Sequence, residues 1–428
     1  MLRWFAILFA GVADAVNRAL TNRPRLLRLI VGVARRRRPV LRIGSSLFVT
    51  RAEIVREVLE RDDDFSLGPL NARKFLTGDF VISMDPGERY QAEKRLILGS
   101  LPSGRIQSLE TLAEGAARRV LAQRGGDKRV DVVALSEAVT AELVETFWGV
   151  PIATASSRVL RAAPGSETLR LWLRKLASAL ASSSEAPFGA AEIARHCSVE
   201  YLAFMRSWVD GVRSGTTASG GALARLARSA PDADTALRNA AGILVVASAV
   251  ITKAFAHALQ QLLLRPAELA RAADEARAGR RPELSRALFE ALRFNPVFPI
   301  LVREAPRATV LAAGTPHETL VPAGATVFVS PLAALFDPEA VPEPDRFLAG
   351  RSPRLNAQFR SAGDRYGVAQ GGVDLLFGGG QHRCLGDEIA LAVITSMAIP
   401  LLAENPQRGE RRIRYDGAAA ARFEVELA

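Results

Sequence analysis

The sequence predicts a single domain that is mainly α-helical with small β-sheets. Ala, Leu and Arg dominate a chain that is 49% hydrophobic and only 6% aromatic, and these three residues favour helix. Helical spacing of apolar residues recurs over most of the 428 positions. β-branched residues with turn signals gather mainly in residues 40–50 and 308–330. No linker or repeat interrupts the chain, so we expect a domain at 39–428 preceded by an apolar and basic helical extension at 1–38.

The N-terminal half predicts a hairpin followed by helices. Residues 40–50 alternate and break at Gly44-Ser45, and residues 51–61 form a short helix. Asp85 is expected to cap the next helix, with Pro86 in its first turn. Two longer helical regions follow, at 109–146 with a break near Gly125-Gly126 and at 160–215 with a break at 182–187.

The C-terminal half centres on one long apolar helix. Asp232 or Asp234 caps it, and Pro266 ends it after about Leu264. Residues 240–251 are apolar nearly all round, so this helix should run buried through the middle of the molecule. The remaining expected elements are a helix over 281–294, two or three short strands within 308–330 and a helix over 385–403.

Charge and cysteine content restrict the class of protein. The net charge of +11 is spread over many helices, and no nucleic-acid motif accompanies it, so we expect solvated basic faces and no nucleic-acid partner. Two cysteines, Cys197 and Cys384, form no disulfide framework and suit a reducing, cytoplasmic location.

The N-terminus leaves three alternatives open. Residues 4–13 are apolar but too short to span a bilayer, which takes about 20 residues. Ala13-Asp14-Ala15 resembles a signal cleavage site. The apolar residues 26–33 before the basic run 35–38 suit a helix lying on a membrane surface. An ordinary surface or channel helix, peripheral membrane contact and a cleaved signal are therefore all considered.

Cys384 carries the clearest chemical signal. It lies in the run Phe377-Gly-Gly-Gly-Gln-His-Arg-Cys-Leu-Gly386, where glycines let backbone amides approach and His382 and Arg383 add basic groups. Such surroundings are expected to lower the thiol pKa and to prepare a metal ligand. The pattern F-x-x-G-x-(H/R)-x-C-x-G resembles the heme-binding loop of the cytochrome P-450, or heme-thiolate, superfamily. The resemblance implies heme b with Cys384 as the proximal iron ligand, and Phe377 and Gly386 as part of the cofactor loop.

Further residues carry the same resemblance in the same order. Glu290 and Arg293 form an E-x-x-R, and Arg346 lies in Pro344-Asp-Arg-Phe347. By resemblance these three make the buried triad that stabilises the scaffold. Arg303 matches the arginine that pairs a heme propionate. Arg89 stands where the family often has a propionate-binding histidine, and Glu93 stands at an arginine position, so that second contact is not expected.

The central helix departs from the family pattern. The oxygen-activating A-G-x-(D/E)-T falls on 246–250, so Ala249 replaces the acid and Val250 replaces the alcohol. Neither can deliver a proton. Ser248 and Thr252 are the nearest hydroxyls, but each is turned by roughly 200° from the alcohol position on a regular helix. A π-bulge could bring Thr252 toward the heme, whereas a bond to its own helix backbone would not.

The resemblance implies a bacterial heme-thiolate monooxygenase that hydroxylates a hydrophobic lipid, terpenoid or polyketide with O₂. Electrons would come from a separate ferredoxin or other acidic redoxin, because no reductase-like segment is fused to this sequence. A basic loop at 354–372 with Arg383 would receive it. The alternatives are a peroxide-driven or reductase-independent heme-thiolate enzyme and a non-catalytic heme-binding sensor.

Overall fold

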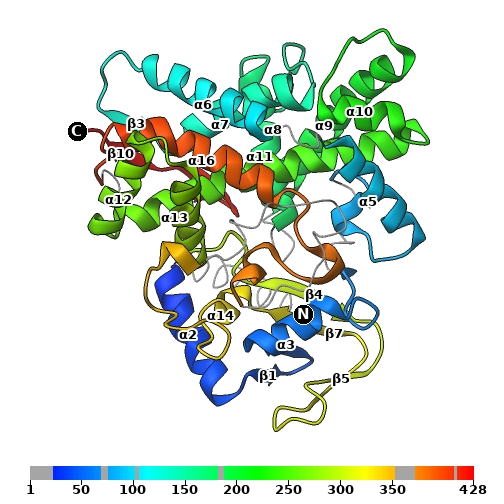
Figure 1. Ribbon diagram of the computed structural model, residues 1–428. Helices are drawn as coiled ribbons and strands as arrows, with labels where there is room; N and C mark the ends of the chain where they lie inside the picture. The colour runs from blue at the N-terminus through cyan, green and yellow to red at the C-terminus, as the bar shows by residue number, and fades with distance from the viewer. Residues whose placement is uncertain (1–22, 69–75, 102–105, 182–187, 352–371, 409–411) are drawn as a thin grey trace.

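The computed structural model describes residues 23–68, 76–101, 106–181, 188–351, 372–408 and 412–428. Most described residues lie in helices; the largest sheet lies at the lower end of the molecule in Figure 1, and the strands of residues 129–131 and 424–426 lie at the upper end. The predicted fold class, mainly α with small β-sheets, is confirmed. The helices are α2 (Pro24–Arg37), α3 (Ala52–Glu60), α5 (Glu88–Ser100), α6 (Ile106–Ala122), α7 (Val132–Leu143), α8 (Ser166–Ala181), α9 (Phe188–Ser214), α10 (Ala222–Ser229), α11 (Ala233–Leu263), α12 (Pro266–Arg277), α13 (Arg281–Phe294), α14 (Pro331–Ala334) and α16 (Asp387–Ala403).

Within the described residues the strands form four sheets, of which the largest has the order β1-β2-β7-β4. In it β1 and β2 make the predicted hairpin around Gly44, whose positive φ of 62° favours glycine. β2 runs parallel to β7, and β7 runs antiparallel to β4, so residues far apart in sequence meet in this sheet. The strands are β1 (Val40–Ile43), β2 (Ser46–Val49), β3 (Arg129–Asp131), β4 (Leu301–Ala305), β5 (Thr309–Leu311), β6 (Thr319–Val321), β7 (Ala325–Val329), β8 (Arg414–Asp416), β9 (Ala419–Arg422) and β10 (Glu424–Glu426).

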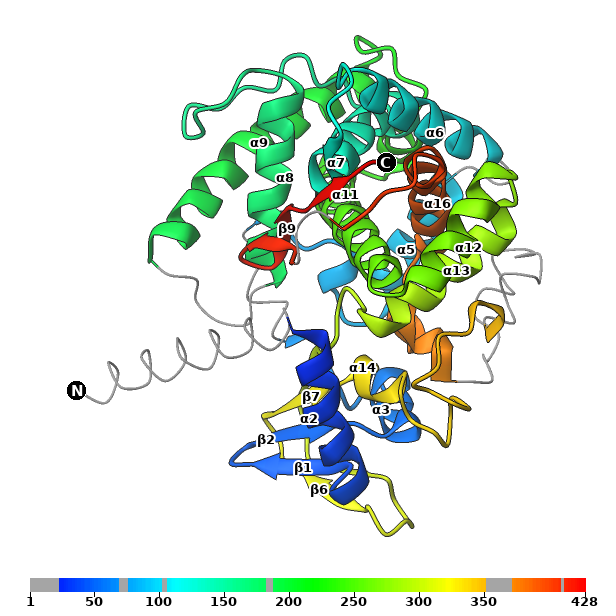
Figure 2. The same ribbon diagram turned by 90° about the vertical axis from the view of Figure 1, so that its left-hand side faces the viewer.

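The predicted long central helix is α11, which runs through the helical part of the molecule (Figure 2). The Asp232 side chain accepts a hydrogen bond from the Thr235 backbone N–H at 2.6 Å, so the predicted cap is confirmed. Gly242 leaves no space for a side chain, because a Cβ there would lie 2.3 Å from the Phe80 ring. Among the described residues, two helical stretches, Ala233–Leu263 and Gly380–Ala403, are long and apolar enough to cross a membrane. In each, 72% of the most apolar 18-residue window is buried, as in core helices of globular proteins.

Helix α2 is packed onto the domain on one side. Leu27 and Val31 are buried in a cluster with Phe294 and Phe336, and Arg35 donates to the Ala333 carbonyl at 2.8 Å. The helix predicted for this region is therefore confirmed over residues 24–37. The division of the chain after residue 38 stays a prediction.

One predicted helix cap is wrong. α5 begins at Glu88 with Gly87 at the capping position, and the Asp85 carboxylate instead accepts from the Leu67 backbone N–H at 2.6 Å. Asp85 thereby joins the segment before α5 to the chain that follows α3. The competing bond to a distant backbone amide takes the side chain away from its own helix.

Candidate heme-thiolate site

The Cys384 loop, residues Phe377–Gly386, lies directly before α16. The Cys384 backbone N–H donates to the Phe377 carbonyl at 2.9 Å, and the Gly386 N–H points at the Cys384 Sγ at 3.4 Å. Cys384 is an exposed residue, whereas Cys197 is buried. Of the two thiols, Cys384 is therefore the one that a ligand can reach.

The Cys384 thiol does not have the depressed pKa that the sequence predicted. Desolvation of the thiol by the surrounding protein, assisted by the Asp387 carboxylate, raises the Cys384 pKa to about 11, although the residue keeps access to solvent. Arg383 contributes little because its guanidinium pairs with Asp387 at 2.9 Å. The protein alone does not stabilise the thiolate here, and a coordinated metal ion would do so.

Two other segments hold the Cys384 loop in place. Gly380 has a φ of 60°, and a Cβ there would lie 2.0 Å from the Leu59 carbonyl at the end of α3. From α5, the Tyr90 hydroxyl and the Lys94 ammonium each donate to the Gln381 carbonyl at 2.6 Å. The loop is therefore fixed between α3 and α5, and only glycine fits at its closest approach.

Buried polar groups gather beside the loop. Arg303 on β4 is 5% exposed and donates to the Val302 carbonyl, while its Nε has no hydrogen-bond partner among the described residues. His382 is packed against the Tyr90 ring at 5.0 Å between centroids, and its Nε2 also has no hydrogen-bond partner within the described part of the chain. Burial, with Arg303 and Lys94 nearby, lowers the His382 pKa to about 3, so His382 is neutral at pH 7.

Arg89 does not join this group. Its side chain is 55% exposed and pairs with Asp79 at 3.1 Å and with Glu93 at 3.0 Å. Tyr90 and Lys94, one residue further along, have the same spacing of four and face the loop instead. The expected role of Arg89 is therefore wrong, because a shift of one residue turns a helical side chain by about 100°. Sequence reasoning missed Tyr90 and Lys94, although their spacing could have indicated them.

The predicted triad is present in two of its three members. Glu290 and Arg293 are 1% and 0% exposed and are joined by two hydrogen bonds of 2.9 and 2.8 Å. Arg346 contributes only its backbone carbonyl, which accepts from Arg293 at 3.1 Å, while its own guanidinium is 66% exposed and pairs with Glu343. The third guanidinium is that of Arg351, whose Nε lies 3.4 Å from the Glu290 carboxylate. Arg346 was the wrong arginine because its carbonyl, and not its side chain, points inward.

The middle of α11 has an apolar face that is only half-buried. Ile243, Val246, Ala247 and Val250 follow the spacing i, i+3, i+4, i+7 and are half-buried, whereas Leu244, Val245 and Ser248 between them are buried. α16, which starts three residues after Cys384, packs against α11. This face of α11 is therefore apolar and not fully covered by other side chains.

Ser248 and Thr252 lie on the opposite side of α11. Both are buried, and the Ser136 hydroxyl on α7 donates to the Thr252 Oγ1 at 3.1 Å. α11 is a regular α-helix over this stretch, without a π-bulge. As the spacing on a regular helix predicts, the Ser248 and Thr252 side chains turn away from the Val250 position, and Thr252 contacts Ser136 on α7. This placement does not support either residue as a catalytic hydroxyl. The hydrogen bond of the Thr252 hydroxyl is with a side chain on another helix, and not with the backbone of its own helix as considered from the sequence.

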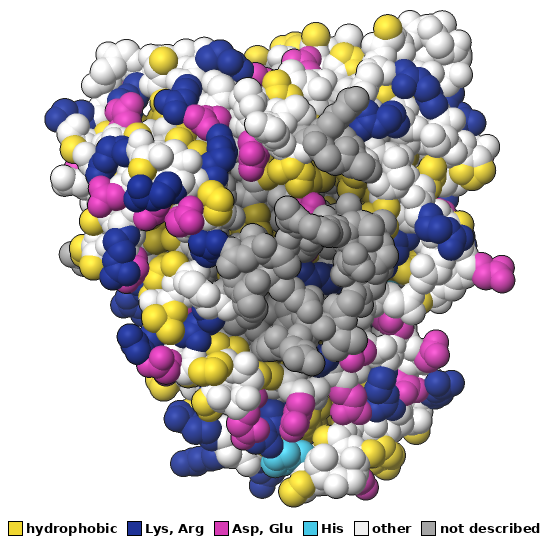
Figure 3. Space-filling model, viewed as in Figure 1, with side chains coloured by type: hydrophobic (Ala, Val, Ile, Leu, Met, Phe, Trp, Pro, Cys, Tyr) yellow, Lys and Arg dark blue, Asp and Glu magenta, His cyan; other side chains and the backbone are white. Residues whose placement is uncertain are grey.

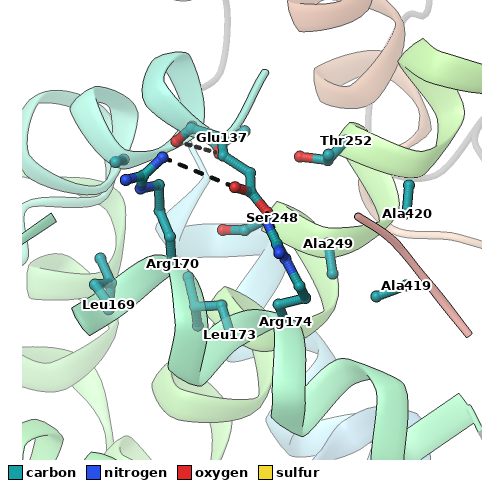
Figure 4. A pocket seen from close by; sticks show the side chains of 12 residues that line it. Glu137, Leu169, Arg170, Leu173, Arg174, Ser248, Ala249, Thr252, Ala419 and Ala420 are labelled. Atoms are coloured by element: carbon teal, nitrogen blue, oxygen red, sulfur yellow. Dashed lines mark hydrogen bonds and ion pairs between the residues drawn. The ribbon is translucent and has the colours of Figure 1, made fainter. Parts of the chain in front are cut away.

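A pocket opens on this second side of α11. Figure 4 shows Glu137 between Arg170 and Arg174 above Ser248, with Ala249 beside the strand that carries Ala419 and Ala420. Glu137 accepts from Arg174 at 2.9 and 2.5 Å, and burial raises the Glu137 pKa. The lining residues are Glu137, Thr140, Ala141, Leu169, Arg170, Leu173, Arg174, Ser248, Ala249, Thr252, Ala419 and Ala420.

The donor set fits a heme better than a free metal ion. A bare ion needs several protein ligands, and no group of three His, Cys, Asp or Glu side chains suited to a metal occurs among the described residues. One sulphur suffices for a metal whose other ligands belong to a macrocycle. Arg303 Nε and His382 Nε2 have no hydrogen-bond partner in the described part of the chain, although the Asp62 carboxylate lies 3.9 Å from His382 Nε2, so both nitrogens are free to bond a carboxylate-bearing cofactor. The predicted basic loop at 354–371 lies outside the described residues.

One reachable cysteine on a glycine-rich loop, close to a long apolar helix, is the arrangement that a heme-thiolate site would need. Comparisons with known proteins agree. The cytochrome P450 family model matches residues 268–404. Cyclooctat-9-en-7-ol 5-monooxygenase of Streptomyces melanosporofaciens is 35% identical over 102 residues, which is 24% of this chain and 19% of that protein. The matched segment thus spans about a fifth of the relative's length.

Solved structures extend the likeness to almost the whole chain. P450BioI, in complex with an acyl carrier protein carrying hexadec-9Z-enoic acid, superposes with a TM-score of 0.77 at 17% identity, over 96% of this chain and 100% of that one. The open cytochrome P450 EryK of S. erythraea has a TM-score of 0.73 at 21% identity, with 94% and 95% covered. CalO2 has a TM-score of 0.76 at 16% identity, with 95% and 96% covered. The chain therefore has the fold of these cytochrome P450 structures, and its residues 268–404 match the cytochrome P450 family model.

Proposed function

We propose that this protein is a heme-thiolate monooxygenase that hydroxylates a hydrophobic small molecule with O₂ and electrons from a separate redoxin. The observation that carries the proposal is the Cys384 loop, whose one reachable thiol stands on a glycine-rich turn before α16. Heme bound there would supply the activation of O₂. Cys384 would be the iron ligand, and Arg303, His382 and Lys94 would hold the propionates.

The remaining residues would position the substrate and exclude water. The half-exposed face of α11 is apolar at all four of its positions, so it would bind a hydrocarbon skeleton by contact and not by hydrogen bonds. Similar proteins have hydrophobic ligands. The relative from Streptomyces melanosporofaciens is named for cyclooctat-9-en-7-ol, a mutant of EryK has been solved with erythromycin B, and P450BioI with a hexadec-9Z-enoic acid on its carrier protein. We therefore propose a lipid, terpenoid or polyketide as the substrate class.

Proton delivery is the step for which this chain departs most from its family. Val246, Ala249 and Val250 carry no exchangeable proton, and the Thr252 hydroxyl is turned to Ser136. In the proposed reaction a hydroxyl of the substrate, or a water that the bound substrate retains, supplies the proton. This makes the substrate itself a part of the catalytic machinery.

A reductase-independent, peroxide-driven reaction is the second candidate, and the same observation favours it. An enzyme that receives both oxygen atoms and both electrons as peroxide has less need of the acid and alcohol. The location proposed for either enzyme is the cytoplasm of a bacterium. Arg383 is the described member of the predicted redoxin patch, and its pairing with Asp387 makes it a weak contributor.

The test measures product from a panel of lipids, terpenoids and polyketides, with redoxin plus O₂ in one arm and hydrogen peroxide in the other. Product that requires redoxin supports the monooxygenase. Product with peroxide alone supports the second candidate and contradicts the first. Tight ligand binding with no product in either arm would leave only the sensor.

A matched pair of variants ties the activity to the loop. Cys384→Ser should abolish product and shift the heme absorbance, while Cys197→Ser should change neither, because Cys197 lies on α9 with its side chain buried in the core.

A further inference from the structure

Helix α2 is apolar on two sides, of which only one is covered. Leu27 and Val31 are buried against the domain. A second row at spacing i, i+3, i+4, i+7 points outward, and we name it the α2 stripe: Leu26, Leu29, Ile30 and Val33, which are 39%, 62%, 44% and 41% exposed. These are four of the eleven large hydrophobic residues exposed in the described structure, all on one 14-residue helix. Such clustering marks an interaction surface.

The same helix is strongly and uniformly basic. Its 14 residues include no Asp or Glu, and its last turn is basic throughout. Exposed arginines flank the stripe at both ends, and we name them the α2 arginines: Arg23, Arg25, Arg36, Arg37 and Arg38. Figure 3 shows basic and hydrophobic side chains together along the lower left edge of the molecule, where Figure 1 places α2.

The combination of stripe and arginines selects the partner. An apolar row beside cationic side chains matches the boundary between acyl chains and anionic headgroups. A nucleic acid would use the arginines but gains little from exposed leucines. An acidic groove on a protein would also bind the stripe. However, the α2 arginines lie at both ends of the helix, and a flat anionic lipid surface can contact both ends at once.

We propose that α2 docks this protein on an anionic lipid surface. The helix lies in the plane of the interface, with the α2 stripe in the acyl boundary and the α2 arginines at the headgroups. The buried side, with Leu27, Val31 and Arg35, stays attached to the domain, so the sheet and α14 are carried to the membrane without rearrangement. The proposal rests on exposure and charge, and not on the proposed reaction.

The test is sedimentation of the full chain with vesicles of phosphatidylcholine, with or without phosphatidylglycerol. Binding should require the anionic lipid and should weaken between 0.1 M and 1 M salt, because the Debye length falls from about 10 Å to about 3 Å. Arg36→Gln, Arg37→Gln and Arg38→Gln together should weaken it roughly 100-fold, at about fivefold per arginine. Leu29→Glu with Ile30→Glu should weaken it at least about tenfold.

Controls of equal charge change lie elsewhere on the surface. Arg158→Gln, Arg161→Gln and Arg271→Gln together remove three exposed arginines, and Val199→Glu with Leu320→Glu changes residues that are 70% and 61% exposed. Both control proteins should bind as the parent does. Far-UV circular dichroism of every variant checks that the fold is intact.

Three results would overturn the proposal. In the first, the parent chain does not bind anionic vesicles. In the second, the α2 variants bind as well as their controls, so the lipid contact must lie elsewhere in the chain, for example in residues 1–22. If the arginine variant alone lost binding and Leu29→Glu with Ile30→Glu kept it, α2 would be a general polyanion site, and RNA in place of vesicles should then bind equally. Product formation is measured in a separate assay in detergent-free buffer. Failure of the proposed reaction would therefore not change the interpretation of vesicle binding.

Discussion

Replacing Glu290 by glutamine removes the only negative charge that faces the buried Arg293 guanidinium at hydrogen-bond distance among the described residues. The carboxylate accepts two bonds of 2.9 and 2.8 Å from Arg293 and one of 3.0 Å from the Leu348 backbone N–H. Arg293 also lies 4.5 Å from the centroids of Phe294 and Phe336, so the variant leaves a cation in an apolar site. Breaking a buried pair from one side costs about 3–5 kcal/mol. We therefore expect Glu290→Gln to lower the free energy of unfolding by about 3 kcal/mol, the lower end of this range, because glutamine keeps part of the hydrogen bonding.

Urea unfolding followed by far-UV circular dichroism measures this loss, and two arginine variants give it a scale. Arg346→Gln should cost under about 1 kcal/mol because its side chain is 66% exposed. Arg351→Gln should cost more than Arg346→Gln, because its guanidinium is 9% exposed and reaches Glu290 and the Glu343 carbonyl. A loss below about 1 kcal/mol for Glu290→Gln would refute the reasoning. So would an Arg346→Gln variant as unstable as Glu290→Gln, since Arg346 would then be the third member after all.

Three further outcomes are expected. Lys94→Met should weaken heme binding at least about tenfold, as seen by heme transfer to a scavenger, whereas Arg89→Met should leave it within about twofold. Thr252→Val should lower the free energy of unfolding by about 1 kcal/mol, because the hydrogen bond with Ser136 is lost. The yield of product per O₂ consumed should stay unchanged. A large fall in that yield would show that the Thr252 hydroxyl takes part in catalysis. Burial lowers the pKa of His257 from 6.5 to about 3, so on acidification the unfolded chain takes up this proton before the folded chain does, and stability falls as the pH drops below 6.5. Between pH 6.5 and about pH 5, the free energy of unfolding of His257→Gln, measured in urea titrations, should fall by about 2 kcal/mol less than that of the parent. Equal losses in the two proteins would contradict this.

The residues that could be predicted are those whose signal is local. The hairpin at Gly44, the cap at Asp232 and the Cys384 loop each follow from a few neighbouring residues, and the structure has the first two as expected and the loop as a compact turn. Asp85 failed because its partner, the Leu67 amide, is 18 positions away. Arg346 and Arg351 are close in sequence, and which one turns inward depends on the packing around Glu290.

The site residues on helices show the same limit. On α5 the sequence offered Arg89 and Tyr90 as neighbours, and only the packing of that helix on the loop selects Tyr90 and Lys94. On α11 the spacing did predict that Thr252 turns away from the position of Val250, but it could not predict that Ser136 on another helix would bind it. The raised pKa of the Cys384 thiol was also missed, because the depth of the sulphur is a property of the whole fold.

The attachment of the Cys384 loop to α3 and α5 bears on the order in which the chain assembles. The Tyr90 hydroxyl and its acceptor at Gln381 are separated by 291 positions, and Leu59 is still further from Gly380 along the chain. Closing such distant contacts is slow and comes at a late stage of folding. The cofactor cradle is then completed only when the first hundred residues have docked onto the last sixty. The segment at 268–404, which matches the cytochrome P450 family model, contains the cysteine but not the α3 and α5 residues that hold its loop.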